Sequence, residues 1–129
     1  MEQDKSLTET VRFWRLLGLL LSSGVPILSA LELLGREVSL AGLRAAAGDV
    51  AGAVREGGTM AMALAKHPAF FSKTAVEMCR LGEEEANVVA RCEDIAEGLK
   101  TGRLPLSSPE DAAIRSSPED GKATPAAPS

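Results

Sequence analysis

Residues 13–34 read FWRLLGLLLSSGVPILSALELL and carry the clearest structural signals of the sequence. Its first half is apolar at three- and four-residue steps, which is typical of a helix buried on much of its circumference. The inner stripe consists of Leu7, Val11, Trp14, Leu17 and Leu21, widened by Phe13, Leu16 and Leu20. Gly24 suits the left-handed residue that ends a helix, and Pro26 suits the first turn of the next one. The stretch therefore predicts two helices joined by a tight turn.

The same periodicity predicts four more helices along the chain. The six helices are expected over residues 7–22, 26–35, 40–56, 60–66, 72–81 and 84–100. Ser6 and Glu9 have the spacing of a capping box for the first helix, and Ser39 and Thr59 can cap the third and fourth. The breaks between helices fall at Gly24, Gly57-Gly58, His67-Pro68 and Gly82. Because no strand signal occurs, we predict an all-α six-helix bundle with short turns.

The helix expected over residues 40–56 contains three glycines. Gly42, Gly48 and Gly52 each weaken a helix by up to about 1 kcal/mol relative to alanine. This cost is offset only where a glycine lets another helix approach closely.

The composition changes abruptly after Gly102. Five of the seven prolines lie between Pro105 and Pro128, together with serine, alanine and acidic residues. Such a segment cannot bury enough apolar surface to offset the entropy of ordering it. We therefore predict a helical domain over residues 1–103 and a disordered tail over residues 104–129. The tail repeats SSPED at 107–111 and 116–120, which reads as low-complexity drift or, alternatively, as a binding or phosphorylation motif.

Charge and hydropathy exclude several classes of partner. The formal net charge is −4 and the basic residues are scattered singly, which argues against nucleic acid. The uncharged run from Leu16 to Leu31 is too short and too interrupted for a spanning helix, which needs about 20 mostly apolar residues. Acidic residues near the start also argue against a signal peptide. We expect a cytoplasmic protein with no membrane span in this chain.

The residue types that carry chemistry form no catalytic set. Two cysteines and one histidine cannot make the four-ligand cluster of a structural zinc site. Cys79 and Cys92 lie on apolar helical faces, as inert buried thiols do, with a disulfide as the alternative if the last two helices pair. His67 lacks a nucleophile or carboxylate partner by sequence, so we assign it to a turn. We expect no enzyme activity and no cofactor.

Acidic residues cluster around the expected start of the last helix, at residues 83–85, with Glu93 and Asp94 further along. The dipole of a helix favours acidic residues at its N-terminus, so a structural role is preferred to a metal site. Glu83 is still the best candidate for a polar contact, either to a partner or to a bound cation.

Four motifs, in order, resemble the cytoplasmic F domain of type II secretion and type IV pilus assembly platforms. They are residues 13–34, the segment VREGGTMAMAL at 54–64, KHPAFF at 66–71, and Leu81-Gly82-Glu83. The motif positions that set the shape are Gly24, Pro26, Gly57, His67, Pro68, Phe70, Gly82 and Glu83. The chain departs from the family pattern after Glu83, where residues 84–88 read EEANV and the family usually continues with Ser-Gly and then leucine. It also carries one copy of the domain where relatives usually carry two, with several membrane-spanning helices.

The resemblance implies a six-helix bundle at the cytoplasmic face of the bacterial inner membrane. Relatives there link an assembly ATPase to pilin or pseudopilin polymerisation and are not enzymes. The resemblance therefore implies that this chain is an adaptor whose partners are another F-domain platform protein or the assembly ATPase. Relatives tend to self-associate, and helix faces rich in alanine and glycine permit a homodimer. The alternative is a stand-alone helical regulator or scaffold whose tail binds the partner.

Overall fold

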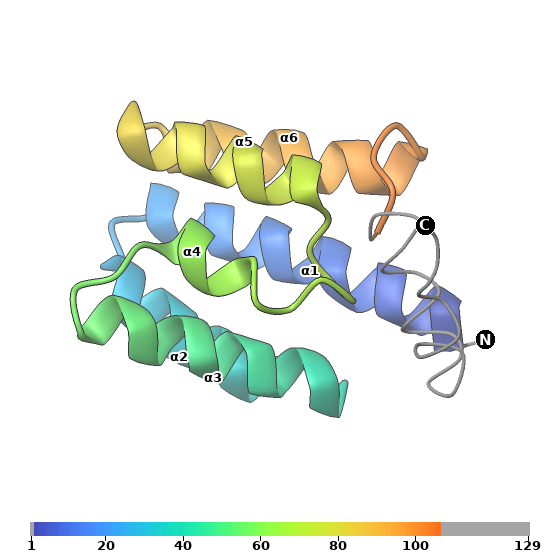
Figure 1. Cartoon of the computed structure of the whole chain (residues 1–129), viewed down its shortest axis with the longest axis horizontal. Coiled ribbons are helices and arrows are strands. Elements are labelled where there is room, and N and C mark those ends of the chain that lie inside the picture. The colour runs from blue at the N-terminus through green and yellow to red at the C-terminus, as the bar shows by residue number, and fades with distance from the viewer. Residues whose placement is uncertain (1, 107–129) are drawn as a thin grey trace, which may run out of the picture.

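The computed structural model describes residues 2–106, and in this part of the chain every regular element is an α-helix (Figure 1). The helices are α1 (Glu2–Ser22), α2 (Ile27–Glu37), α3 (Ala41–Arg55), α4 (Met60–Leu64), α5 (Lys73–Glu84) and α6 (Val88–Thr101). The predicted all-α fold of six helices joined by short turns is confirmed. The repeated SSPED segment and the rest of residues 107–129 lie outside the described residues. None of the described helices has the length and apolar character that crossing a bilayer requires.

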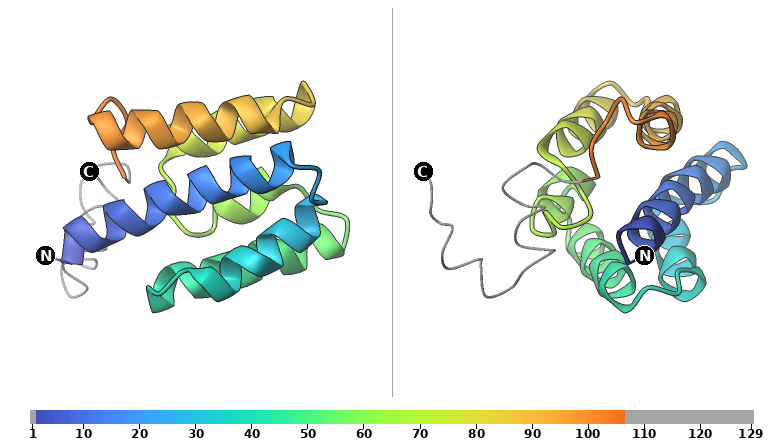
Figure 2. Two further views of the ribbon diagram at one scale, coloured as in Figure 1. Left: turned by 180° about the vertical axis from the view of Figure 1, so that it is seen from behind. Right: turned by 90° about the vertical axis from the view of Figure 1, so that its right-hand side faces the viewer.

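The helices are arranged around a common core. Each helix packs against the next one in the chain, and α6 returns to pack along α1. In Figure 1, α1 and α4 lie between the α2–α3 pair and the α5–α6 pair. The end-on view in Figure 2 shows the helices surrounding a shared centre. The contact between α1 and α6 therefore closes the bundle by joining segments from its two ends.

The centre of the core is aromatic. Phe13 and Trp14 on α1 meet edge to face with ring centroids 5.4 Å apart, and Phe71 lies 5.4 Å and 5.9 Å from them. Such pairs contribute about 0.5–1.5 kcal/mol beyond the burial of their surface. The aliphatic part of the core includes Leu17, Leu31, Leu34, Leu43, Val50, Met60, Leu64, Ile95 and Leu99. Phe71 thus fastens the segment between α4 and α5 to the central helix.

The turn between α1 and α2 has the expected form. Gly24 has a φ of +96°, and the backbone N–H of Val25 donates to the carbonyl of Leu20 at 3.0 Å. Pro26 is the N-cap of α2 and has an extended backbone. A left-handed glycine followed by a proline is therefore what ends one helix and starts the next.

The start of α1 differs from the prediction. Ser6 is buried within α1 and does not cap it, because the helix already begins at Glu2. The carboxylate of Glu9 instead accepts a hydrogen bond from the backbone N–H of Ser39 at 3.0 Å. Ser39 is not the cap of α3 either, since Leu40 occupies that position without a side-chain hydrogen bond. Glu9 therefore ties the α2–α3 connection to α1.

The end of α5 also differs, because Gly82 does not end the helix. A Cβ atom placed on Gly82 would lie 2.7 Å from Cγ of Arg91 and 3.2 Å from Cα of Val88. Glycine is needed here for the close approach of α6. The turn is made by Ala86, whose φ is +56°, and the N–H of Asn87 donates to the carbonyl of Gly82 at 2.7 Å. This hydrogen bond gives the turn the form of a Schellman motif with alanine at the left-handed position.

The three glycines of α3 have different surroundings. A Cβ atom on Gly42 would lie 3.0 Å from the ring of Phe70, whereas Gly48 and Gly52 have nothing within 4 Å. Only Gly42 therefore permits a close contact in the described structure. Gly48 and Gly52 leave the helix weakened with no contact to offset the cost.

Candidate interaction surface

Glu83 holds the first turn of α4. Its Oε2 accepts the backbone N–H of Met60 at 2.7 Å, and its Oε1 accepts that of Ala61 at 3.1 Å. The hydroxyl of Thr59 accepts the N–H of Met62 at 3.2 Å, as expected of an N-cap. Together the two side chains satisfy three of the backbone donors that a helix leaves free at its start. Because so short a helix is unstable alone, α4 depends on this contact with α5.

The binding of a cation or partner by Glu83 remains a prediction. The structure shows that its half-buried carboxylate is already engaged by two backbone amides. Within residues 2–106, no group of three or more His, Cys, Asp or Glu side chains is placed to hold a metal ion.

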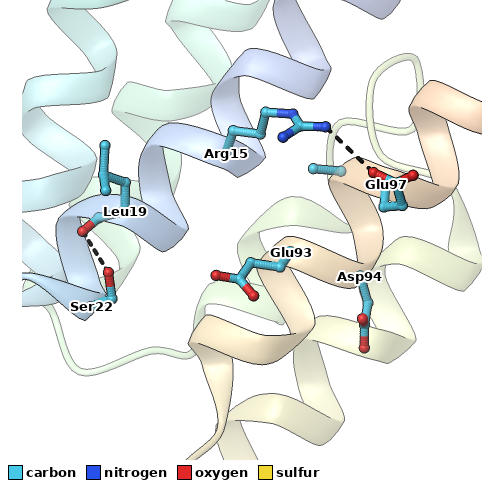
Figure 3. Close-up of a pocket in the computed structure, with 7 residues that line it drawn as sticks. Arg15, Leu19, Ser22, Glu93, Asp94 and Glu97 are labelled. Atoms are coloured by element: carbon cyan, nitrogen blue, oxygen red, sulfur yellow. Dashed lines mark hydrogen bonds and ion pairs between the residues drawn. The ribbon is translucent and has the colours of Figure 1, made fainter.

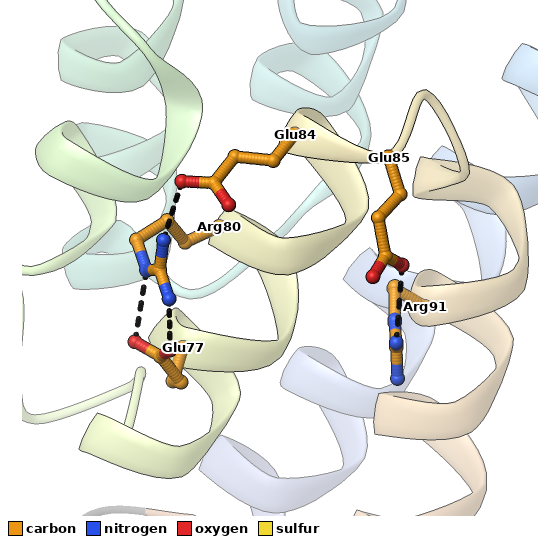
Figure 4. Close-up of polar contacts among 5 residues, drawn as sticks. All are labelled: Glu77, Arg80, Glu84, Glu85 and Arg91. Atoms are coloured by element: carbon orange, nitrogen blue, oxygen red, sulfur yellow. Dashed lines mark hydrogen bonds and ion pairs between the residues drawn. The ribbon is translucent and has the colours of Figure 1, made fainter.

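The other glutamates of this cluster lie at the C-terminal end of α5, not at the N-terminus of α6 as the dipole argument assumed. This follows from the continuation of α5 past Gly82. Glu77 and Glu84 flank Arg80, and Glu85 lies 3.3 Å from Arg91 across the turn (Figure 4). Hydrogen bonds from Arg80 hold the pKa of Glu77 below its usual value. The exposed pairs contribute little to stability because water screens them.

The turn at His67, Pro68 and Phe70 joins α4 to α5 and lies against α3. The carbonyl of His67 accepts the backbone N–H of Phe70 and that of Phe71, each at 3.1 Å. Its Nε2 lies 3.0 Å from a carboxylate oxygen of Asp49 on α3. Together with the contact between Phe70 and Gly42, this places both ends of the turn on α3. The sequence could not reveal Asp49 as the partner, because Asp49 lies on α3 whereas His67 lies in the turn after α4.

The two thiols are buried and free on α5 and α6, as expected, and the alternative of a disulfide is not realised. Burial raises the pKa of Cys92 to about 12. Burial also raises the pKa of Cys79, and the negative charge of Glu83 adds to that effect. Both thiols are therefore protonated and poorly reactive near neutral pH.

A groove of about 500 Å³ lies between α1 and α6 (Figure 3). Its polar and charged side chains are Arg15 and Ser22 from α1 and Glu93, Asp94 and Glu97 from α6. Leu19 also lines the groove and is 61% exposed. Figure 3 shows Glu93 pointing from α6 toward α1, and Asp94 pointing away from it.

Sequence reasoning named Glu93 and Asp94 but missed the residues of α1 that line the same groove. Arg15 lies 3.5 Å from Glu97, and this ion pair links the first helix to the last. The signal for Leu19 was present, because it is the one leucine of residues 16–21 that lies off the inner stripe. The groove itself depends on the pairing of α1 with α6, which no local pattern encodes.

Comparison with known proteins identifies the family. Residues 13–103 match the family described as type II secretion system (T2SS), protein F. The chain belongs to this protein F family. It is also similar to the type 4 fimbrial assembly protein PilC of Pseudomonas putida, with 33% identity over 99 residues that make up 77% of this chain. The same alignment covers 24% of that relative, so the chain spans about a quarter of its length.

The resemblance drawn from the four motifs is thus confirmed, and the structure shows what most of their residues do in this protein F domain. Gly57, with a φ of +95°, forms the turn that leads into α4, and His67 and Phe70 form the turn that leaves it. Gly82 brings α6 against α5, and Glu83 on the same helix caps α4. These motif residues converge on α4 and its neighbours. None of the residues that line the groove between α1 and α6 is one of these shape-setting motif positions, although the α1 side lies within the first motif.

Proposed function

We propose that this chain is a non-catalytic adaptor of a type II secretion or type IV pilus assembly platform. It binds another protein F family member or the assembly ATPase through its helix faces. The observation that carries the proposal is membership of the protein F family over residues 13–103 on a six-helix domain. The side chains best suited to chemistry support it, because Glu83 caps a helix and both thiols are buried. These groups serve the fold.

The proposed location is the cytoplasm, at the cytoplasmic face of the inner membrane. The chain would contribute one helical domain to an assembly whose other members supply the rest of the platform. The proposal also includes self-association of the chain, because Gly48 and Gly52 leave part of α3 open to the close approach of another helix.

The test is affinity purification of the tagged chain from cross-linked native cells, with mass spectrometry of the recovered proteins. The proposal expects an assembly ATPase or another protein F family member, enriched over a tag-only control. A folded chain that recovers neither protein contradicts it.

A shortened chain lacking residues 105–129 separates this proposal from the stand-alone regulator. An adaptor that binds through helix faces keeps its partners after the deletion. A regulator whose tail does the binding loses them. Circular dichroism of the shortened chain confirms that the helices remain, so that a loss is assigned to the tail itself.

A further inference from the structure

The groove between α1 and α6 exposes an apolar side chain that the bundle does not cover. Leu17 of the same helix is fully buried, and Leu16 and Leu20 are half-buried against the core, whereas Leu19 is 61% exposed and lines the groove. An exposed leucine costs stability only modestly and is common on its own. Leu19 is of interest because it lies in a groove between two helices, and such a groove can bind a helix of a partner protein.

The α6 side of the groove carries more negative charge than its surroundings neutralise. Three carboxylates, from Glu93, Asp94 and Glu97, lie along the α6 side of the groove, and the groove holds one guanidinium, that of Arg15 on α1. Arg15 pairs with Glu97, while Glu93 and Asp94 form no ion pair within residues 2–106. Glu93 and Glu97 are also one helical turn apart, where like charges repel and weaken the helix. A cationic neighbour would relieve this repulsion.

Charge decides between the occupants that could fill the groove. A second copy placed symmetrically would bring the same acidic side chains against each other, since a two-fold interface uses the same patch on both subunits. Residues 107–129 of the chain itself are unsuited as well, because they contain four acidic residues and two basic ones. The complementary occupant is a basic segment of a different protein.

We propose that this groove binds a basic amphipathic helix of a partner protein. One aliphatic side chain of that helix packs on Leu19, and lysine or arginine side chains one turn apart face Glu93 and Glu97. The proposal rests on the proposed function, because it supplies the surface and the partner chemistry of the adaptor. Helix-in-groove recognition provides the apolar anchor, and charge complementarity sets the orientation and the choice of partner.

The test is site-specific photo-cross-linking in native cells, with Leu19→p-benzoylphenylalanine in the full chain. Mass spectrometry then identifies the cross-linked peptide. The same photo-reactive residue at Met62, which is 67% exposed on α4 and outside the groove, is the positional control. The expected product at position 19 is a segment of another protein that carries lysine or arginine at three- or four-residue spacing, and this product is absent at position 62.

Charge variants add the second readout. Glu93→Lys is expected to lower the cross-linking yield by roughly five- to tenfold, because it turns an attraction into a repulsion. Glu56→Lys makes the same change on an exposed residue at the end of α3, outside the groove, and is expected to leave the yield within about twofold. Circular dichroism of each variant shows that the helices are retained.

Several results would overturn the inference. They are a cross-linked segment without basic residues, a segment from a second copy of this chain or from its residues 107–129, and a yield that Glu93→Lys leaves unchanged. The affinity purification keeps this failure distinct from failure of the proposed function. If the chain recovers a platform protein while position 19 yields no cross-link, only the groove assignment fails. If it recovers none and position 19 also yields nothing, both fail.

Discussion

Replacing Gly82 by alanine adds a methyl group at the point where α6 comes closest to α5. The new Cβ would lie 2.7 Å from Cγ and 3.2 Å from Cβ of Arg91, and 3.2 Å from Cα of Val88. Cγ of Arg91 can move with its side chain, but Cβ of Arg91 and Cα of Val88 can move only with the backbone of α6. We therefore expect Gly82→Ala to separate the two helices slightly and to destabilise the domain.

The magnitude follows from two opposing contributions. Overpacking of a close contact costs about 1–3 kcal/mol. Alanine in a helix gains up to about 1 kcal/mol over glycine, which offsets part of that cost. The expected net loss is about 1–2 kcal/mol in the free energy of unfolding. The matched control is Gly48→Ala on α3, where nothing lies within 4 Å. Alanine there should stabilise the domain by about 0.5–1 kcal/mol.

The assay is urea unfolding followed by far-ultraviolet circular dichroism and by fluorescence of the buried Trp14. The same chemical change should thus move the unfolding midpoint in opposite directions at the two positions. If Gly82→Ala proves as stable as the unsubstituted chain, or gains as much as Gly48→Ala, the close contact between α5 and α6 is refuted.

Three further predictions concern the contacts around α4, the α5–α6 turn and the thiols. Glu83→Gln removes the charge that caps α4 and should cost about 0.5–2 kcal/mol, with faster hydrogen exchange at the amides of Met60 and Ala61; unchanged exchange at both amides would contradict the capping role. Ala86→Gly relieves a left-handed alanine and should stabilise the domain by about 1 kcal/mol in urea unfolding, and a loss of stability would contradict the strain assigned to this turn. Because burial raises the pKa of Cys92 from 9.0 to about 12, the unfolded chain loses this proton first, so stability is complete below pH 9 and falls as the pH rises toward 12. Cys92 contributes a slope of up to about 1.4 kcal/mol per pH unit to the free energy of unfolding, and this contribution should be missing in Cys92→Ala. Rapid reaction of the native thiols with a thiol reagent at neutral pH would contradict their burial.

Much of the fold was predictable because its signals are local. Gly24 and Pro26 mark a turn through their own backbone preferences, and Thr59 caps the helix that follows it directly. The apolar spacing of α1 likewise identifies its buried side without knowledge of what packs there. Elements defined by such short-range rules appeared at nearly the expected residues.

The misassigned features have partners that are distant in the sequence. Glu9 has the spacing of a capping residue, yet it accepts a hydrogen bond from Ser39. Gly82 resembles a helix terminator, yet its role is set by Arg91 on the next helix. A glycine or a glutamate fits either role equally well in the sequence, and only the packing of the helices distinguishes them.

The candidate surface was the least predictable part. Arg15 and Glu97 are far apart in the sequence and come into contact only because α6 packs against α1. The acidic residues were visible in the sequence, but the exposed leucine opposite them became significant only when the groove was seen.

Isothermal titration calorimetry measures directly whether this helical domain binds other platform proteins, as we propose. The purified full chain is titrated with the assembly ATPase, and separately with the cytoplasmic part of another protein F family member, both from the same cell. We expect saturable binding to at least one of them, with a Kd of about 1–100 μM. Absence of binding to both proteins, each folded and present at about ten times that upper limit, would contradict it.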